Sequence, residues 1–538
     1  MYLTERLHQG TVEAANNVTN WSGTVFLTPL IGAFVADAYL GRYWTFVAGS
    51  AVYLLGMLLL TLAVSVPALK PPPCDGAGTV ATCPRASALQ LGVYFGGLYT
   101  IALGHGGTKP NISTIGADQF DDFHPAERRH KLSFFNWWMF TVFLGILFST
   151  TVLVYLQDTV SWSVGYAVPT LALAASVAVF LAGTPLYRHK LPQGSPLSRM
   201  CKVVAAAVWK RHVPAPEDTT ELHELEPDHY ANRRRFRVDA TAGSMRFLNK
   251  AAVKAAEEAP PWTLCTVTEV EETKQIAKLL PLLATMVVPC ALVAQVGTLF
   301  VRQGATLDRR VGAFKVPPAS LGAFVTVTML VCVALYDRVV VPAVRRRTEN
   351  PRGITLLQRI GAGLLLQVVT MATTAAVENR RLSFARSHHD VGGEVPLTIF
   401  VLLPQFVLMG AADAFLVVGQ IEFFYDQAPE SMKSLGTAMS LTAYGAGSML
   451  SSAILSLVER ATARGSGAAT PWVGDDLNAS RLDRYYAFLA ALAAANLAAF
   501  VALSCRYSYR AESVEAIDVA AQDGGAARVH SELGLVAP

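Results

Sequence analysis

Residues 22–68 read SGTVFLTPLIGAFVADAYLGRYWTFVAGSAVYLLGMLLLTLAVSVPA and contain two long apolar runs, 22–43 and 44–68. The charged residues Asp37 and Arg42 lie close to the junction between the runs. Each run exceeds the ~18 residues that mark a membrane-spanning helix, because ~20 residues at 1.5 Å per residue cross about 30 Å of hydrocarbon. The stretch therefore predicts two consecutive membrane-spanning helices.

The same pattern recurs along the 538-residue chain. Of its residues, 52% are hydrophobic and 16% are charged, whereas a soluble domain carries about 25% charged residues. The charges gather in short clusters between apolar runs, so we predict an all-α membrane protein with about eleven spanning helices. The predicted spans are residues 22–43, 44–68, 89–116, 134–157, 162–186, 277–301, 319–343, 355–378, 396–423, 435–458 and 485–505.

A long polar stretch divides these spans into two groups. Residues 188–276 hold the basic clusters RHK and RRRFR, followed by acidic and Pro-rich pieces. We predict an N-terminal helical bundle of five spans in residues 1–187, a linker in residues 188–276 and a C-terminal six-helix bundle in residues 277–506. Residues 507–538 form a tail whose polar composition is typical of disorder.

Basic residues set the predicted orientation. Arg and Lys clusters follow the third, fifth and seventh spans, whereas the loops after the second and fourth spans carry far fewer. Because Lys and Arg are enriched in cytoplasmic loops, the linker and the tail are predicted to be cytoplasmic. The loop ENRRLSFARSHHD, after the eighth span, goes against this trend. The glycosylation sequons at Asn17 and Asn478 then fall on the outer side.

This orientation places residue 1 outside, because five spans precede the cytoplasmic linker. A twelve-span protein with both ends in the cytoplasm would have one more helix before MYLTERLHQG. Two interpretations stay open: the first helix is missing from this sequence, or the protein begins outside.

Two loops of the predicted bundles resemble each other. GAFVADAYLGRYW, with Asp37 and Arg42, follows the first span, and LYDRVVVPAVRRR, with Asp337 and Arg338, follows the seventh. If one helix is restored at the start, these loops follow helices two and eight. Parallel repeats of six helices are the plan of major facilitator transporters, whose substrate site lies between the halves at mid-membrane.

Two ionisable side chains near the end of the third span are candidate functional groups, since a charge within the membrane is costly unless it is paired or hydrated. Lys109 lies in LGHGGTKPN, where three glycines and Pro110 are expected to loosen the helix and free backbone groups that only a cavity or neighbouring protein could satisfy. The alternative is a lysine whose ammonium reaches the cytoplasmic headgroups. His105 is either a proton relay or a neutral side chain with satisfied hydrogen bonds.

Three further polar residues lie in the C-terminal spans. Asp413 is well inside the ninth span, in MGAADAFLVV, where small neighbours allow close helix packing. Its carboxylate either binds a solute or proton or forms a structural ion pair. Gln295, in the sixth span, either lines a cavity or bonds to a neighbouring helix. Glu422 lies nearer the cytoplasmic end and is a candidate gate residue.

Other motifs exclude several classes of protein. The seven cysteines include no CxxC pair, and no His/Cys cluster has metal-ligand spacing, so no metal site is predicted. Cys74 and Cys83 share the loop PPPCDGAGTVATCP and are candidates for a disulfide if that loop faces outside. No HExxH, GxSxG or P-loop string occurs, so an enzyme is not expected. The net charge of +4 is small, and the basic residues lie between spans, which predicts no nucleic-acid partner.

Strings along nearly the whole chain resemble the plant nitrate and peptide transporter family, the plant branch of the proton-dependent oligopeptide transporters in the major facilitator superfamily. The strings are LHQGTVEAANNVTNWSGT, LIGAFVADAYLGRYWTF, GHGGTKP, GADQFDD, SFFNWW, LPQFVLMGAADAF and IEFFYDQAPESMKSLGTAMSLT, in the family's order. They look most similar to the fifth subfamily. The resemblance implies proton symport by alternating access of two six-helix halves.

The resemblance also implies roles for particular residues. The family's first helix carries an E-x-x-E-R motif that pairs with a lysine of the fourth helix. Lys109 matches that lysine, but the motif is absent here. Glu5 and Arg6 look similar to part of it, yet they align just past the first helix and do not take its role.

Residues implied to contact substrate depart from the family's pattern. Asp413 falls where the family commonly has a glutamate that, in peptide transporters, receives the peptide's amino group. Val293 replaces a histidine linked to nitrate binding in one branch. Met139 and Phe143 stand where peptide carriers usually have a tyrosine and an asparagine. These departures favour a hydrophobic or less peptide-like solute.

We therefore predict a secondary active transporter that carries small organic solutes by proton-coupled symport, with di- and tripeptides as the first candidates. The alternatives are a carrier of nitrate, of another small anion or of a hormone-like acid, and a truncated, non-transporting form. The expected partners are a small-molecule substrate, protons and the lipid bilayer, with no cofactor beyond the proton gradient. Among host membranes, the plasma membrane is favoured over the vacuolar membrane.

The predicted site residues fall into three groups. Substrate binding is assigned to Asp413, Gln295, Phe143 and Met139, and proton coupling to Lys109 and His105. The cytoplasmic gate is assigned to Asp37, Arg42, Asp337, Arg338 and Glu422.

Overall fold

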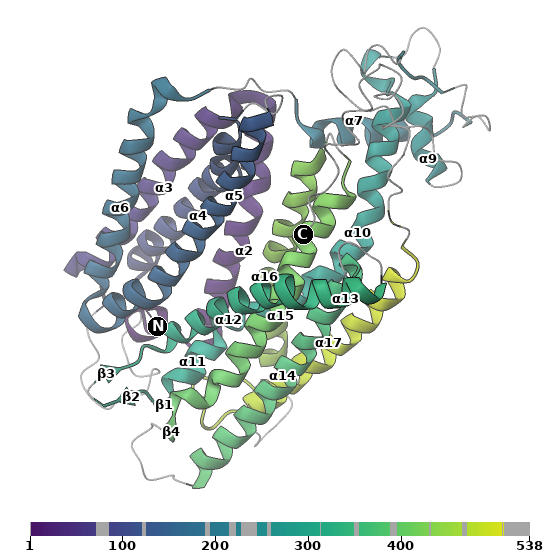
Figure 1. Cartoon of the computed structure of the whole chain (residues 1–538). Coiled ribbons are helices and arrows are strands. Elements are labelled where there is room, and N and C mark those ends of the chain that lie inside the picture. The colour runs from purple at the N-terminus through teal and green to yellow at the C-terminus, as the bar shows by residue number, and fades with distance from the viewer. Residues whose placement is uncertain are drawn as a thin grey trace. The chain divides into compact units, whose positions relative to one another are not determined.

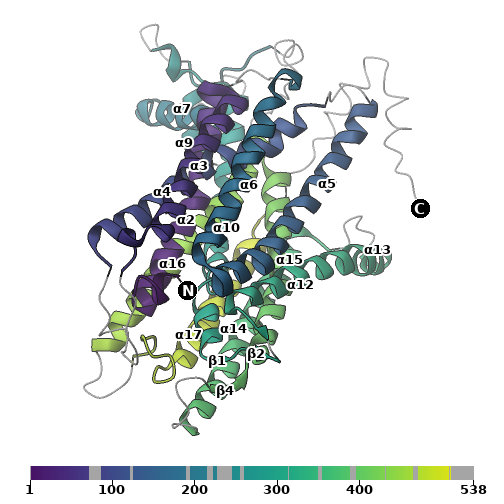
Figure 2. The ribbon, with the colours of Figure 1, turned by 90° about the vertical axis from the view of Figure 1, so that its left-hand side faces the viewer.

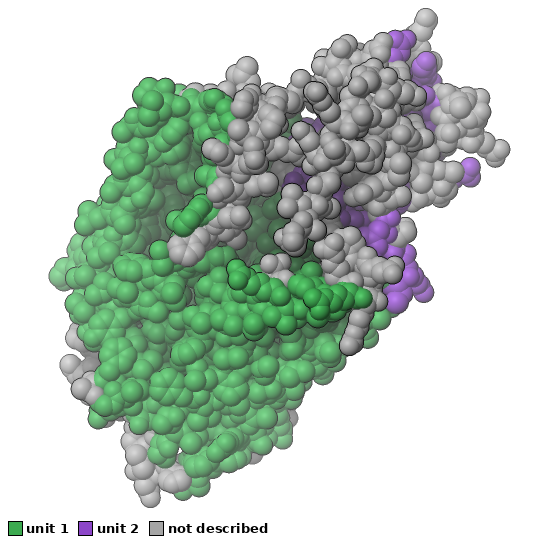
Figure 3. Space-filling view, in the orientation of Figure 1, with its two compact units in different colours: residues 1–195, 281–424, 437–504 green, residues 196–280, 425–436, 505–538 purple. Residues whose placement is uncertain are grey.

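The computed structural model describes most of the chain, and the described part is largely helical (Figure 1). The described residues are 2–71, 86–120, 125–188, 194–214, 222–226, 245–254, 260–312, 314–348, 354–387, 395–429, 432–464, 471–507 and 509. They form two compact units, which Figure 3 colours separately. Unit 1 comprises residues 1–195, 281–424 and 437–504, and unit 2 comprises residues 196–280, 425–436 and 505–538.

The first helices of unit 1 form an N-terminal bundle. They are α1 (Tyr2–Glu5), α2 (Thr11–Val35), α3 (Gly41–Ser65), α4 (Ala88–Ala117), α5 (Pro125–Phe148) and α6 (Trp162–Ala182). The π-helical segments Ser149–Leu153 and Leu156–Val160 continue the chain beyond α5. Figures 1 and 2 both show α2, α3 and α4 side by side. The long members follow the apolar runs, since a helix satisfies its own backbone groups where water is absent.

Helix α2 begins at Thr11, well before the predicted start at residue 22. The first part of this helix is polar, but its side chains bond to neighbours. Asn16 Nδ2 donates to Ser456 Oγ (2.8 Å) on a distant helix, and Thr19 Oγ1 donates to Ala15 O (3.0 Å). The Asn16 bond joins two helices and the Thr19 bond lies within α2, and both satisfy polar side chains inside a spanning bundle.

The later helices form a C-terminal bundle in unit 1, with some ends in unit 2. They are α10 (Val267–Val293), α11 (Leu299–Ala305), α12 (Gly322–Leu335), α13 (Val341–Thr348), α14 (Leu356–Ser387), α15 (Leu403–Gln427), α16 (Lys433–Arg464) and α17 (Leu482–Ser504). The predicted span 277–301 is a broken helix, since α10 ends at Val293 and α11 begins at Leu299. Two short strand pairs follow: β1 (Leu307–Asp308) with β4 (Val395–Thr398), parallel, and β2 (Arg310–Val311) with β3 (Phe314–Lys315), antiparallel.

Within the described residues, nine helical segments are long and apolar enough to cross a membrane. The first of them, Thr11–Ser65, covers both α2 and α3. Helix α4 is not among the nine, and it carries the polar residues His105, Lys109 and Asn111. The structure thus has helical segments along each of the predicted spans, and the fold is that of a polytopic α-helical membrane protein.

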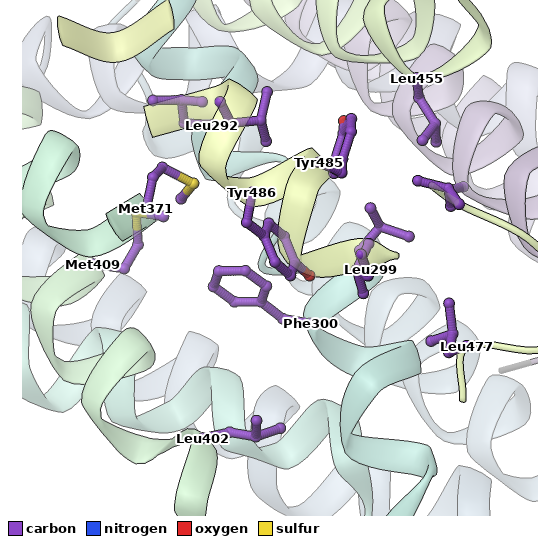
Figure 4. Packing of buried hydrophobic residues seen from close by; sticks show 14 of the residues in the cluster. Leu292, Leu299, Phe300, Met371, Leu402, Met409, Leu455, Leu477, Tyr485 and Tyr486 are labelled. Carbon is purple, nitrogen blue, oxygen red and sulfur yellow. The ribbon is translucent and has the colours of Figure 1, made fainter. Parts of the chain in front are cut away.

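Each bundle has a buried hydrophobic core. In the C-terminal bundle, Phe300 lies edge-on against Phe406 and Tyr486, with ring centroids 5.5 and 5.7 Å apart. Figure 4 shows Phe300, Tyr486 and the methionines Met371 and Met409 in this cluster. Such offset aromatic pairs stabilise a core by about 0.5–1.5 kcal/mol beyond the area that they bury.

Helix α4 remains a continuous helix through its glycines and Pro110, from Ala88 to Ala117. The prediction that GHGGTKP loosens the helix is therefore wrong. These glycines are instead places of close backbone approach: a Cβ on Gly106 would lie 2.7 Å from Thr28 O of α2, and one on Gly107 would lie 2.9 Å from Gly49 Cα of α3. The glycines allow three helices to pack with their backbones nearly touching.

This packing makes a testable difference between two glycines of the same helix. Gly106→Ala is expected to lower the free energy of unfolding by about 1–3 kcal/mol, because the new methyl group must displace backbone atoms. Gly96 has no atom within 4 Å of its Cβ position. Gly96→Ala is expected to be neutral or to stabilise by up to about 1 kcal/mol, through better helix propensity. Thermal unfolding of both purified variants in detergent checks this, and equal destabilisation would contradict a close approach of α4 to α2 at Gly106.

The two similar loops have the same local structure. Residues Ala36–Leu40 and Tyr336–Val340 are both five-residue π-helical segments between two α-helices. Asp37 and Asp337 each occupy the second position of their segment. Short π-helical segments of this kind are rare in proteins. Segments of the same kind also follow α5, at Ser149–Leu153 and Leu156–Val160, so the interpretation of the loops as a repeat rests on their matching sequences and positions.

Unit 2 contains folded structure where the sequence predicts a polar linker. Helix α7 (Pro196–Trp209) and the short helix α9 (Arg246–Asn249) lie within residues 188–276, and α10 begins there, at Val267. Val203, Ala206 and Ala207 of α7 are fully buried in a small hydrophobic core. A hydrophobic core of its own distinguishes this part of the chain from a simple connector.

Candidate functional site

Asp413 lies on α15 with a side chain that is almost wholly buried, at 7% exposure. Its Oδ1 atom has no hydrogen-bond partner among the described residues. It lies within electrostatic range of Cys290 on α10 and Tyr444 on α16. A buried carboxylate with an unsatisfied oxygen is costly, and within a membrane helix such a group is a functional candidate by default.

Lys109 lies on α4 in the opposite bundle. Its ammonium Nζ stands 4.5 Å from the centroid of the Phe26 ring on α2, a cation–π contact. Phe26 in turn packs against Tyr444 on α16, with ring centroids 5.4 Å apart. The side chain of Lys109 is therefore directed at the interface between the bundles and contacts an aromatic ring there.

The two charged groups are thus linked through one aromatic pair. Lys109 contacts Phe26 from the N-terminal bundle, and Asp413 lies in range of Tyr444 in the C-terminal bundle. Phe26 and Tyr444 were not identified from the sequence, because nothing in the chain shows which two aromatics of the different bundles meet. This arrangement can neutralise a molecule that carries one positive and one negative group.

His105 lies one helical turn before Lys109 on α4. Its ring meets Tyr53 of α3 edge-on, with centroids 6.3 Å apart, and its Nε2 atom is buried with no hydrogen-bond partner among the described residues. The structure therefore places His105 against α3. Its role as a proton relay stays a prediction.

The other predicted substrate-binding residues differ in burial and in what the structure describes of them. Gln295 is 2% exposed, and its Nε2 donates to Ser451 Oγ (3.0 Å) and to Ala291 O (3.3 Å). Of the two interpretations of Gln295, this contact corresponds to the bond with a neighbouring helix, here α16. Phe143 is partly buried on α5. Met139 is also on α5, but its side chain lies outside the described part of the structure.

The predicted gate residues of the N-terminal bundle form an ionic cluster. Arg42 Nη1 lies 2.6 Å from Asp118 Oδ2, and Arg42 Nε lies 3.9 Å from Asp37 Oδ1. The cluster joins the α2–α3 junction to the end of α4. Asp118 belongs to the string GADQFDD, but its pairing with Arg42 could not be deduced from the sequence, since 76 residues separate the two.

The predicted gate residues of the C-terminal bundle are less closely linked. Glu422 Oε2 lies 3.3 Å from Arg359 Nη1, and the Arg359 guanidinium stacks over Tyr336, 4.3 Å from the ring centroid. Arg338 is exposed, whereas the side chain of Asp337 lies outside the described part. The disulfide candidates Cys74 and Cys83 also lie outside the described residues. Within the described residues, no group of His, Cys, Asp and Glu side chains is arranged to hold a metal ion.

The buried ion pair between Glu378 and Arg381 on α14 was not predicted from the sequence. Arg381 and Glu378 are both fully buried, with Nη2 to Oε1 at 2.7 Å and Nε to Oε2 at 2.8 Å. Arg381 Nη1 also donates to Asn478 Oδ1 (2.6 Å), and Gln303 Nε2 donates to Glu378 Oε2 (2.6 Å). Arg381 belongs to the loop string that opposes the orientation rule, and its charge is neutralised inside the bundle. The i, i+3 spacing was the signal that could have identified the pair.

The asparagines of the two sequons are both engaged in contacts. Asn478 accepts the bond from Arg381, and Asn17 lies inside α2, where its Nδ2 donates to Gln9 Oε1 (3.0 Å). A glycosylated asparagine normally stands on a surface loop. The structure therefore does not support Asn17 as a glycosylation site.

A cavity of about 580 Å³ lies between the bundles. It is lined mainly by apolar and aromatic side chains of α2, α3, α4 and α6, including Trp21, Tyr94 and Trp162, with Arg302 of α11 at one side. Lys109 and Asp413 are not among its lining residues. A second cavity, of about 430 Å³, shares Gln157 and Trp162 with the first and includes Asp158.

The two bundles meet along one end of unit 1. Thr11 N donates to Asp475 Oδ1 (2.7 Å), and Arg309 Nη1 lies 3.9 Å from Asp158 Oδ2. Further along, a Cβ on Gly23 of α2 would lie 3.0 Å from Gly445 O of α16. The Thr11–Asp475 bond lies at the start of α2, away from Asp37 and Arg42, at the end that the sequence predicts to face outside, whereas Gly23 lies at the middle of α2.

Comparisons with known proteins agree with this architecture. The sequence profile of the POT family matches residues 43–473. The chain is 54% identical to Protein NRT1/PTR FAMILY 5.2 of Arabidopsis thaliana, over 96% of this chain and 89% of that protein. It is 46% identical to Protein NRT1/PTR FAMILY 5.1 of the same plant, over 95% of this chain and 86% of that protein.

Solved structures share the fold. An auto-inhibited POT family peptide transporter superimposes with a TM-score of 0.65 at 20% identity, over 94% of this chain and 90% of that one. A POT family transporter in complex with a thioalcohol-conjugated peptide gives a TM-score of 0.58 at 13% identity, over 92% and 88% of the two chains. Members of this family are transporters and not enzymes. The matched profile, the relatives and the two-bundle fold together show that this chain belongs to the POT family, as a multi-pass membrane transporter of the NRT1/PTR type.

Proposed function

We propose that the protein is a proton-coupled symporter of small zwitterionic organic solutes, with di- and tripeptides as the first candidates. Similar POT family transporters have been crystallised with a thioalcohol-conjugated peptide and with 5-aminolevulinic acid. Both kinds of ligand are small and organic.

The observation that carries the proposal is that Lys109 contacts Phe26, which packs on Tyr444, while the buried Asp413 interacts electrostatically with Tyr444 from the other bundle. A zwitterion can place its ammonium group at the Asp413 carboxylate and its carboxylate at Lys109. Each charge then gains a partner in a region where unpaired charge is costly. Phe26 and Tyr444 would contact the part of the solute between its charged ends.

Proton coupling is assigned to Lys109, whose amine binds the substrate carboxylate only while it is protonated. The proton and the solute are then bound together, as symport requires. The Asp413 oxygen that has no partner among the described residues is available to accept the substrate ammonium.

Contacts at the end of unit 1 predicted to face outside support a state that is closed to the exterior. The Thr11–Asp475 bond and the Asp158–Arg309 pair both join the two bundles there. Transport would require these contacts to break while the bundles rock against each other. The Asp37–Arg42–Asp118 cluster would keep the opposite end of the N-terminal bundle together during this motion.

Competition during uptake tests the substrate class. In a transport-deficient host that expresses the full chain, uptake of a labelled dipeptide should be faster at acidic than at neutral external pH. Unlabelled dipeptides should suppress it, and nitrate should not. Suppression by nitrate or by a hormone-like acid, without suppression by dipeptides, would favour an anion carrier and contradict the proposal.

A further inference from the structure

The part of unit 2 between the bundles in sequence has a fold of its own, formed by α7, residues 222–226, residues 245–254 and the start of α10. We call it the linker module. Its core includes Val203 and Ala206 of α7 together with Ala251, Ala252 and Cys265, all fully buried. Helix α7 therefore has one face that is fixed against protein.

Hydrogen bonds join the segments of the linker module to one another. Cys265 N donates to Ala251 O (3.1 Å), and the buried Lys210 Nζ donates to Val253 O (2.7 Å). Glu224 Oε2 accepts bonds from the backbone N (2.8 Å) and hydroxyl (2.9 Å) of Thr268, in the first turn of α10. The orientation of α7 within the module is thus defined by both packing and hydrogen bonds.

Helix α7 has a second apolar face, which is exposed. Val204 is 45% exposed, Val208 50% and Trp209 63%. Val204 and Val208 are four residues apart and therefore share one face of the helix. Trp262, 45% exposed, extends this surface, because its ring lies 6.1 Å from that of Trp209. A soluble helix with one face in its core usually has a polar opposite face, so this second apolar face requires an explanation.

Basic groups lie beside the exposed face. Arg211 follows α7 and is exposed, and Lys250 Nζ donates to Arg211 O (2.7 Å). Nearby acidic groups are engaged elsewhere in the module: Glu271 pairs with Lys274 (2.6 Å), and Glu272 pairs with Arg199 (3.6 Å). Among the described residues, the exposed Arg211 thus lies two residues beyond Trp209, and the buried Glu271 and Glu272 are both paired with basic side chains.

We propose that this face of α7, with Trp262, lies in the headgroup region of the bilayer and binds anionic phospholipid. Tryptophan is enriched at membrane interfaces, and a helix with an apolar face and basic neighbours lies in the plane of that interface. Basic residues are attracted to the acidic lipids of the cytoplasmic leaflet, which is the side predicted for residues 188–276. Moreover, α10 starts in the linker module and continues into an apolar span, so the module is tethered to the membrane surface.

Cys201 provides a probe of this face, because it is a free, exposed cysteine of α7. A nitroxide label would be attached to it in the full chain, after Cys74, Cys83 and Cys505 are replaced by serine. In nanodiscs, collisions of the label with oxygen, which enters lipid, are compared with collisions with a neutral nickel chelate, which stays in water. The ratio of the oxygen collision rate to the nickel-chelate collision rate should be several-fold higher when phosphatidylserine is added to phosphatidylcholine.

A paired substitution tests the surface without disturbing the core. Val204→Asp with Val208→Asp should return the label to a water-like ratio, since both side chains are exposed. Val311→Asp, at a valine of similar exposure (48%) on β2, should leave the ratio unchanged. The proposal is overturned if the label is water-accessible in both lipid mixtures. It is also overturned if the paired substitution leaves the collision ratio of the label high, because another protein segment must then shield the face from water.

Discussion

Replacing Asp413 by asparagine is expected to abolish pH-dependent uptake of a dipeptide while leaving the protein at the cell surface. The substitution keeps the shape of the side chain but removes the charge that we propose to bind the substrate ammonium. Loss of one partner of a buried ion pair costs about 3–5 kcal/mol, which corresponds to a hundredfold or greater loss of affinity. Initial uptake rates at two external pH values, normalised to surface protein, measure the effect.

Two variants serve as controls for Asp413. Asp413→Glu keeps the carboxylate and should retain pH-dependent uptake. Asp308→Asn removes the same charge from β1, where the carboxylate accepts a bond from Arg310 N (3.0 Å), and should have little effect. Normal pH-dependent uptake by Asp413→Asn would exclude this carboxylate from the transport mechanism.

Replacing Arg381 by methionine is expected to lower the free energy of unfolding by about 3–5 kcal/mol, because it leaves the buried Glu378 carboxylate without its cation. The bonds of Arg381 to Asn478 and to Leu477 O (3.0 Å) are lost as well, so the loop before α17 is released from α14. Thermal unfolding of the purified protein in detergent should show the largest shift among single substitutions on α14.

The paired variant Glu378→Gln with Arg381→Met separates charge from packing. Removing both charges should recover much of the loss, since a buried pair contributes little beyond the cost of its own desolvation. If the double variant is as unstable as the sum of the two single variants, the charges do not interact in the way that their 2.7 Å distance indicates.

The long helices could be predicted from hydropathy because a spanning segment must be apolar along most of its length. Hydropathy failed where polar side chains bond inside the bundle, as Asn16 does at the start of α2. Sequence patterns also misled at the glycines of α4. Gly106 and Gly107 were expected to loosen the helix, whereas they allow close packing on Thr28 and Gly49, which are distant in sequence.

The candidate site could be predicted only in part. Asp413 and Lys109 stood out because each is a charge in an apolar setting. Their shared aromatic neighbours could not be identified, since Phe26 and Tyr444 are separated by most of the chain and only the packing of α2 on α16 brings them together. The partners of Arg42 and Glu422, which are Asp118 and Arg359, escaped prediction for the same reason.

In the proposed mechanism one zwitterionic solute bridges Asp413 and Lys109, and binding of matched ligands to purified variants tests this bridge most directly. The affinities of a dipeptide, its amino-acetylated form and its carboxyl-amidated form would be measured with the unchanged protein, Asp413→Asn and Lys109→Gln. We expect acetylation to weaken binding to the unchanged protein but to have almost no further effect in Asp413→Asn, and amidation to behave likewise with Lys109→Gln. The contrary result is that the loss of binding free energy from acetylation simply adds to that from Asp413→Asn, and the loss from amidation to that from Lys109→Gln. If both sums hold, the solute does not bridge these two residues, and the proposed mechanism is wrong.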